Sequence, residues 1–69
     1  MELSARNQFR GRVSRIVRGG VVAEVTVEIG NGQEIVSVIT NSSVERLGLR
    51  EGSEVTAIIK ATEVLLAGG

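Results

Sequence analysis

An alternation of apolar and polar residues over positions 21–29 constrains the fold more than any other feature of this 69-residue chain. The odd positions of that segment are all apolar, and the even positions after Val22 are Glu24, Thr26 and Glu28. Successive side chains of a β-strand point to opposite faces, so this period of two predicts a strand with one buried face. Frequent glycine and the absence of proline are typical of a β-rich chain with tight turns.

Glycines on either side of this strand predict two hairpins. After the strand, a loop at Gly30-Asn31-Gly32 would pair Val27 with Ile35 and Ala23 with Ile39. Before the strand, a three-residue loop over residues 18–20, with a glycine in the left-handed conformation, would place the apolar faces of the two strands opposite each other, and it is therefore favoured. That loop would pair Val17 with Val21, Val13 with Val25, Phe9 with Ile29 and Arg10 with Glu28.

The remaining segments predict a small five-stranded barrel. Residues 35–39 are apolar on both faces, which predicts a strand covered on one side by the core and on the other by a helix or a second subunit. Ser42 and Glu45 have capping-box spacing, and Gly48 can end the short helix that follows. Strands over 55–60 and 63–67 would complete an all-β, OB-like barrel with one helix between strands 3 and 4, as a single domain over 1–69.

The length of the chain limits the core that it can bury alone. A domain of this size buries only about 60% of the surface that its unfolded chain exposes. Small domains compensate with disulfides, metals or oligomerisation, but this chain has neither Cys nor His. Self-association is therefore the expected route to stability. The absence of Cys and of a secretory leader favours a cytoplasmic location.

Composition also disfavours several classes of function. Eight basic and eight acidic residues balance, and the single aromatic residue, Phe9, is expected in the core, so nucleic acid is not the predicted partner. No apolar run approaches the roughly 20 residues that span a membrane. An enzyme is not expected, because the chain offers no His or Cys as base or nucleophile and no phosphate-binding loop. Asp is absent as well, which disfavours a hard-cation site.

One set of residues does suggest chemistry, because all of its members can donate hydrogen bonds. Ser4 and Arg6 alternate on an extended segment, and Lys60, Ala61 and Thr62 do so near the other end. Thr40, Ser42 and Ser43 add hydroxyls and helix N–H groups between them. A site made only of donors suits a small oxyanion. Each group also has an ordinary explanation, namely helix capping for residues 40–43 and solvated charge for the other two.

The combination resembles molbindins, the small Mop-type molybdate-binding proteins, and the related TOBE domains. Three stretches carry the resemblance over nearly the whole chain: SARNQFRG at 4–11, VITNSSV at 38–44 with LGLREG at 47–52, and AIIKATEV at 57–64. The resemblance implies strand-exchanged dimers that assemble into a homohexamer, a trimer of dimers. It also implies molybdate or tungstate bound between subunits, with no cation or organic cofactor.

Carried over position by position, the resemblance assigns the oxyanion to Ser4, Arg6, Thr40, Ser42, Ser43, Lys60, Ala61 and Thr62. A second class of site would use backbone N–H groups of Gly19, Gly20, Val21 and Val22. Arg6 is expected to complete its pocket with Lys60 of a neighbouring subunit. The function implied is intracellular oxyanion storage or buffering. The alternatives are a structural oligomerisation module without a ligand and a generic binder of sulfate-like oxyanions.

Overall fold

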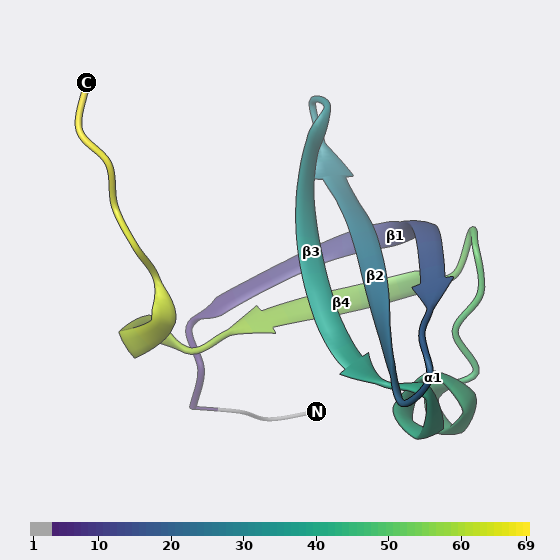
Figure 1. Ribbon diagram of the computed structural model, residues 1–69. Coiled ribbons are helices and arrows are strands. Elements are labelled where there is room, and N and C mark those ends of the chain that lie inside the picture. Colours follow the sequence, from purple (N-terminus) through teal and green to yellow (C-terminus); the bar gives the residue numbers. More distant parts are fainter. Residues whose placement is uncertain (1–3) are drawn as a thin grey trace.

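The computed structural model describes residues 4–69, which form one curled antiparallel sheet with a short helix at one end (Figure 1). The strands are β1 (Asn7–Arg18), β2 (Val22–Gly30), β3 (Gln33–Thr40) and β4 (Glu54–Ile59); helix α1 (Asn41–Leu47) follows β3, and the 3-10 helix η1 (Ala61–Glu63) follows β4. The strand order is β3-β2-β1-β4, so β3 and β4 are the two edges. The mostly-β architecture with a helix between the third and fourth strands is therefore confirmed.

The long strand β1 belongs to two ladders. Its first half pairs with β4 and its second half with β2, and Arg12 takes part in both. Gly11 lies where the two ladders meet. A Cβ atom there would overlap the Glu28 carbonyl oxygen and come within 2.7 Å of Val27 Cγ1. The missing side chain therefore lets β1 cross close to β2, as glycine does at barrel corners.

The second hairpin has the predicted register. Val27 pairs with Ile35 and Ala23 with Ile39. Asn31 and Gly32 at its tip have φ values of 55° and 75°, which Asn and Gly adopt more readily than other residues. The predicted three-residue loop is wrong in detail, because Gly30 pairs with Gln33 and leaves a two-residue tip, and an irregularity between Glu28 and Gly30 restores the predicted register further along the strands.

The predicted register of the first hairpin is wrong. Val13 pairs with Val27 instead of Val25, and Arg12, not Arg10, lies opposite Glu28. The register is already offset at the tip, where Arg18 pairs with Ala23, and a β-bulge at Ser14 then shifts it by one residue. That extra residue reverses which side chains of β1 face inward beyond the bulge. Ile16 consequently packs against the core, whereas Val17 is 43% exposed.

The same hairpin also differs from the prediction at its tip and at its open end. The last pair is Arg18 with Ala23, and the Gly19 N–H donates to the Val22 carbonyl at 2.7 Å, which leaves a two-residue tip without a left-handed glycine. Phe9 pairs with Ala57 of β4 and is 39% exposed, so it is not the core residue that parity suggested.

The N-cap of helix α1 lies two residues before the predicted one. Thr40 is the N-cap, since its Oγ1 accepts a hydrogen bond from the Ser43 N–H, so the expected capping box at Ser42 and Glu45 does not form. Gly48 ends the helix in the left-handed conformation, as predicted, with φ of 64°. Val44 is fully buried, but Leu47, expected on the same face, is 68% exposed.

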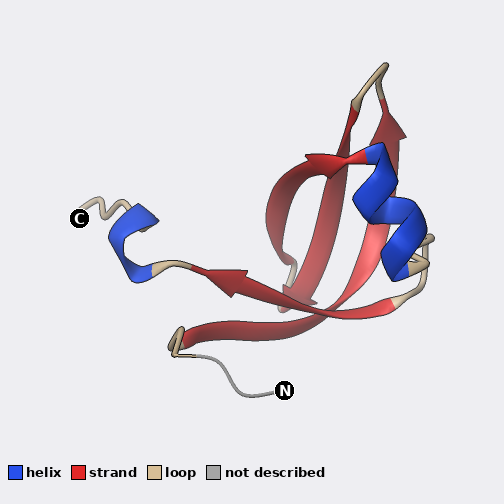
Figure 2. Cartoon of the chain, turned by 90° about the horizontal axis from the view of Figure 1, so that it is seen from below, coloured by secondary structure: helices blue, strands red, loops and turns tan. Residues whose placement is uncertain are grey.

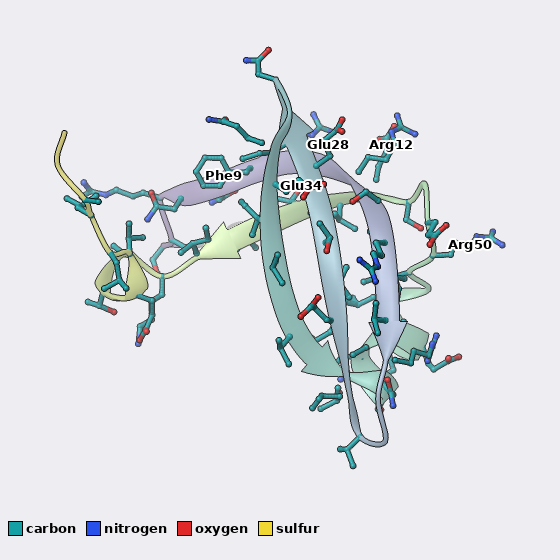
Figure 3. All side chains as sticks on the ribbon, turned by 45° about the horizontal axis from the view of Figure 1, so that its top comes forward. Phe9, Arg12, Glu28, Glu34 and Arg50 are labelled. Carbon is teal, nitrogen blue, oxygen red and sulfur yellow. The ribbon has the colours of Figure 1, made fainter. Side chains whose placement is uncertain are left out.

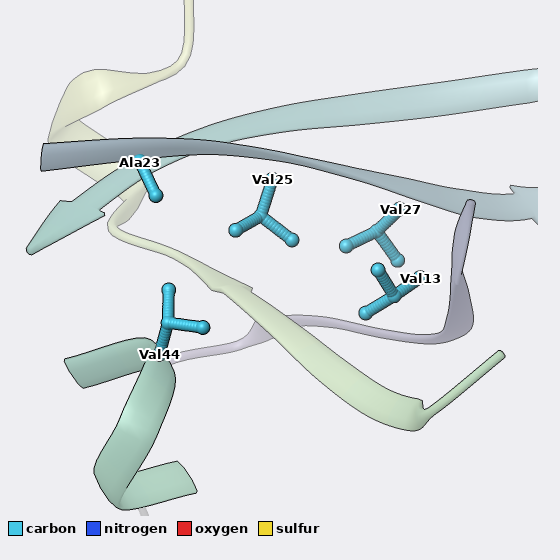
Figure 4. Close-up of a cluster of buried hydrophobic side chains, with 5 residues drawn as sticks. All are labelled: Val13, Ala23, Val25, Val27 and Val44. Carbon is cyan, nitrogen blue, oxygen red and sulfur yellow. The ribbon is translucent and has the colours of Figure 1, made fainter. Parts of the chain in front are cut away.

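The core is small and contains no large side chain. Its fully enclosed members are Val13, Ala23, Val25, Val27 and Val44 (Figure 4). Val44 rises from α1 against side chains of the curled sheet (Figures 2 and 4). Isoleucines and leucines of the described chain contact this cluster only from partly exposed positions.

The fifth strand expected over 63–67 does not form in this chain. Residues 61–63 make the 3-10 helix η1, and the segment after it runs away from both sheet edges (Figure 1). Leu65 and Leu66 are 94% and 92% exposed there. A strand needs a neighbouring edge for its backbone hydrogen bonds, and within one chain this segment has none.

The crossing at Gly11 yields a stability prediction. Gly11→Ala should lower the free energy of unfolding by about 3 kcal/mol, because the new methyl group meets a backbone oxygen that cannot move aside. Urea unfolding followed by circular dichroism measures this. Gly20→Ala is the matched control, because a Cβ atom there meets nothing within 4 Å, and it should change stability by less than about 1 kcal/mol. Equal effects of the two substitutions would contradict the prediction.

Candidate functional site

The first group of predicted donors gathers where the ladder between β1 and β4 ends. The last pair of that ladder is Asn7 with Ile59, so Arg6 and Lys60 come directly after it on the two strands. Figure 1 shows the N-terminal segment and η1 leaving the sheet at this same end. Both charged side chains are exposed, and neither forms an ion pair within residues 4–69. This end of the sheet therefore presents two positive charges, with the Glu63 carboxylate of η1 nearby but not paired with either of them among the described residues.

Backbone geometry adds further donors at this end. The Glu63 N–H donates to the Lys60 carbonyl at 2.8 Å, which closes the first turn of η1. A turn of this kind leaves its first N–H groups without internal acceptors, and here they belong to Ala61 and Thr62. On the facing segment, Gln8 Nε2 donates to the Ala5 carbonyl at 2.7 Å and fixes the backbone beside Ser4 and Arg6. The Gln8 contact was not predicted from the sequence.

The second group, at α1, forms a hydrogen-bonded cap within the chain. Thr40 Oγ1 donates to Ser43 Oγ at 2.9 Å, and Arg46 Nη2 donates to the same Ser43 oxygen at 3.1 Å. Ser42 is exposed and makes no side-chain hydrogen bond among the described residues. In the single chain, therefore, capping accounts for Thr40 and Ser43. The structure leaves only Ser42 free of such a role.

One chain does not bring the two groups together. Residues 40–43 lie where β3 meets α1, whereas Arg6 and Lys60 lie at the start of β1 and the end of β4, on the opposite side of the sheet (Figures 1 and 2). Arg6 and Lys60 of the same chain, by contrast, adjoin one ladder end. The chain's own Lys60 is thus a ready neighbour for Arg6, and the hydroxyls at α1 are what a second chain would have to supply.

The proposed second site lies on the tip of the first hairpin, beside α1. The Asn41 N–H donates to the Val21 carbonyl at 2.8 Å, and Asn41 Nδ2 donates to the Gly19 carbonyl at 3.0 Å. Val21 and Val22 are 74% and 46% exposed. Asn41 was not predicted from the sequence, although it directly follows the cap residue Thr40 and lies one hairpin away from Gly19 and Gly20.

A polar pocket of about 550 Å³ lies elsewhere on the sheet but does not suit an anion. Arg12 in it pairs with Glu54 at 3.6 Å, and Glu28 also lines the wall. The pairing register places Glu34, Glu28, Arg12 and Glu54 in one row across all four strands, and Figure 3 shows three of them. Two arginines, Arg10 and Arg12, and two carboxylates line the pocket, so its charges balance and leave no net positive charge for an oxyanion.

The open side of the sheet forms a larger, mostly apolar groove. It has a volume of about 1080 Å³ and runs between the edge strands β3 and β4. Its lining includes Val25, Val27, Ile35, Ile39, Leu49, Val55, Ile59 and, at its end, Lys60. Residues 4–69 contain no group of three His, Cys, Asp or Glu side chains placed to hold a metal ion. Nor do they include a helix long and apolar enough to cross a membrane.

These features define a class: a small, open β-barrel domain with uncovered hydrogen-bond donors at one end. The model of the TOBE domain family matches residues 3–66. The chain belongs to the TOBE-domain family, which confirms the resemblance noted in the sequence.

Relatives and solved structures agree with that family. Molybdenum-pterin-binding protein 1 of Clostridium pasteurianum is 48% identical over 66 residues, covering 96% of this chain and 97% of that protein. The structure of a molybdate-binding protein from Sporomusa ovata is similar with a TM-score of 0.91 at 40% identity, covering 99% of this chain and 100% of the other. ModG, described as a cytoplasmic molybdate-binding protein and solved with molybdate bound, gives a TM-score of 0.85 at 46% identity, covering 88% of this chain and 43% of the other.

The cap at α1 generates a prediction that separates capping from ligand binding. Thr40→Ala should lower the free energy of unfolding by about 1 kcal/mol, because the Ser43 N–H loses its acceptor. Ser42→Ala, two positions further on, should change it by only a few tenths of a kcal/mol. Chemical unfolding in the absence of any oxyanion measures both. If Ser42→Ala is as destabilising as Thr40→Ala, the assignment of the cap is incorrect.

Proposed function

We propose that this protein is a single-domain binder of molybdate or tungstate that stores or buffers the oxyanion in the cytoplasm. The observation that carries the proposal is the end of the β1–β4 ladder, where Arg6 and Lys60 form no ion pair within residues 4–69 and lie beside free backbone N–H groups. The relatives named for molybdate or molybdenum-pterin binding support the choice of ligand. Binding is the proposed role, not catalysis.

The chemistry of the donors fits this ligand. Molybdate at neutral pH is a tetrahedral dianion without a proton, so each oxygen can only accept hydrogen bonds. One guanidinium and one ammonium balance its charge. Phosphate carries a proton near neutral pH, and its O–H would meet a site without an acceptor, which leaves a buried polar group unpaired. Sulfate also lacks a proton, so discrimination against it would rest on the size of the pocket.

We assign the first site to Ser4, Arg6, Lys60, Ala61 and Thr62, completed by Thr40, Ser42 and Ser43. Because one chain holds the last three on the opposite side of its sheet, the complete site would be drawn from two subunits (Figure 1). An anion bound there stabilises the assembly as well, since any ligand that binds only the assembled form favours it by mass action.

Two features support a strand-exchanged dimer. The groove between β3 and β4 is apolar and bordered by unpaired strand edges, whereas residues 64–69 extend from the chain with Leu65 and Leu66 exposed. This tail is the segment whose sequence predicted a fifth strand. Entering the groove of a second chain would give its backbone an edge to pair with and would bury both leucines.

A second apolar surface supports assembly beyond the dimer. Val36 and Val38 on the outer face of β3 are 58% and 64% exposed, and the register places Val38, Glu24 and Val17 in one row. Val36 and Val38 also border the groove at the β3 edge, whereas Val17 of the same row lies outside the groove. Two distinct contacts suit a closed trimer of dimers, so we propose a homohexamer.

Two alternative functions make different predictions. A purely structural oligomerisation module would use the groove and the outer face but leave Arg6 and Lys60 without a ligand. A generic oxyanion binder would take up sulfate as well as molybdate. Calorimetric titration of the intact oligomer with molybdate, tungstate and sulfate separates all three. Absence of saturable heat with molybdate would refute the proposed function.

The charged pair gives a direct test. Arg6→Gln and Lys60→Gln should each weaken molybdate binding by at least about a hundredfold, because each removes a charge-assisted hydrogen bond in a partly desolvated pocket. Isothermal titration calorimetry measures the change. Arg10→Gln is the control: Arg10 is exposed on the same strand, pairs with Thr56 and belongs to neither site. Affinity in that variant should stay within about twofold of the original.

Mixing the two variants locates the pocket. If Arg6 and Lys60 of one chain act together, co-refolding Arg6→Gln chains with Lys60→Gln chains restores no site. If they come from neighbouring subunits, a fraction of the pockets is intact and tight binding returns. The ladder end shared by the two residues favours the first outcome.

The tail provides a test of the assembly. A double variant, Leu65→Lys with Leu66→Lys, should lower the mass of the oligomer measured by sedimentation or native mass spectrometry, because two charges would have to enter an apolar groove. Ala67→Lys, one position further on, is the control and should leave the mass closer to that of the original protein. An unchanged mass in the double variant would show that the tail is not exchanged.

A further inference from the structure

Asn41 holds the tip of the first hairpin by two hydrogen bonds of different origin. Its backbone N–H donates to the Val21 carbonyl at 2.8 Å, and its side-chain Nδ2 donates to the Gly19 carbonyl at 3.0 Å. The Gly19 and Val21 carbonyl oxygens are therefore turned toward the start of α1. Only the side-chain bond depends on the identity of residue 41.

The bond to Gly19 also sets the direction of a donor. In a planar trans peptide the C=O and N–H groups point in opposite directions. Because the Gly19 carbonyl points to Asn41, the N–H of Gly20 in the same peptide points away from it. This peptide lies between two glycines, the residue type with the least resistance to rotation of its backbone. The Asn41 amide is thus the contact that keeps the plane from flipping.

The tip of the first hairpin also leaves room for a ligand to approach the backbone closely. A Cβ atom on Gly20 would meet nothing within 4 Å, and Gly20 has no left-handed φ, so neither packing nor backbone conformation within the chain requires glycine there. In the part of the chain that the structure describes, the N–H groups of Gly20 and Val21 have no acceptor. Two uncovered donors beside a missing side chain suit an oxyanion.

We propose that Asn41 is the positioning residue of the second oxyanion site: it withdraws the Gly19 carbonyl and aims the Gly20 N–H outward, making the hairpin tip a surface of donors. This inference rests on the proposed function. Asn41 does not touch the anion. It acts through the peptide between Gly19 and Gly20.

The orientation of the amide is itself fixed by this contact. Asn41 Oδ1 is buried and has no hydrogen-bond partner. If the side-chain amide rotated by half a turn, Oδ1 would face the Gly19 carbonyl oxygen and the two acceptors would repel each other. The Nδ2 donor therefore stays on Gly19, and Oδ1 remains unpaired. An apolar residue of similar size would remove this unpaired group. Stability and anion binding should consequently respond differently to substitution at position 41.

The test uses the full chain with the first site disabled by Arg6→Gln and Lys60→Gln, and molybdate as the probe. In that background, Asn41→Leu should weaken the residual molybdate binding by about tenfold, the effect of about 1.4 kcal/mol. Its thermal unfolding midpoint should change little, because Leu is similar in size and removes the unpaired oxygen. Gln33→Leu is the control, an exposed amide in β3 without a side-chain hydrogen bond among the described residues, and should leave binding unchanged.

A second measurement needs no ligand. Asn41→Leu should shift the amide NMR resonances of Gly20 and Val21 and speed hydrogen exchange at the hairpin tip. Unchanged resonances, or unchanged residual binding, would overturn the role of Asn41. If the first-site variant binds no molybdate while the original protein does, there is no second site and this inference fails alone. If the original protein binds none, the proposed function fails.

Discussion

The small size of the core is the constraint on which the rest of this structure depends. The fully buried side chains are four valines and one alanine, and the larger aliphatic residues pack around them from partly exposed positions. A sheet of four strands curled over such a core leaves its two edge strands unpaired and an apolar groove between them. Burying more apolar surface therefore requires material from outside the chain, and the exposed leucines after η1 are the most apolar segment available.

This constraint also explains why the proposed site lies at the periphery of the fold. Lys60 lines the groove and is also the first residue of the chain after the β1–β4 ladder. A second chain that fills the groove would thus end beside the donors. Burial of Arg6 and Lys60 without a counter-charge is unfavourable, whereas burial with a dianion is not. In the proposed assembly, association and anion binding would be coupled, because the same end of the sheet would serve both.

Features that depend on residues close together in the sequence were predicted correctly more often than features that depend on distant residues. The β2–β3 register followed from alternation and from Asn31-Gly32, because both signals act within one hairpin. The β1 register did not, because the tip has two residues instead of three and because the bulge at Ser14, which leaves no mark in composition, reverses the inward face of half a strand. Phe9 was misplaced since β1 pairs there with β4, a partner 48 positions away that parity within a hairpin cannot reveal. The fifth strand failed for a related reason: its sequence favours extension, but the segment runs away from both edge strands of its own sheet.

The candidate site was predictable as a list of donors but not as an arrangement. Chemistry alone selected Arg6 and Lys60, and the ladder shows why they adjoin. The same chemistry could not separate Thr40 and Ser43, which cap α1, from residues free to bind. Nor could it find Asn41, whose effect passes through the carbonyl of another residue. A residue that hides acceptors contributes to a donor-only surface as much as one that supplies donors. Recognising such residues requires the orientation of peptide planes, which only the folded chain defines.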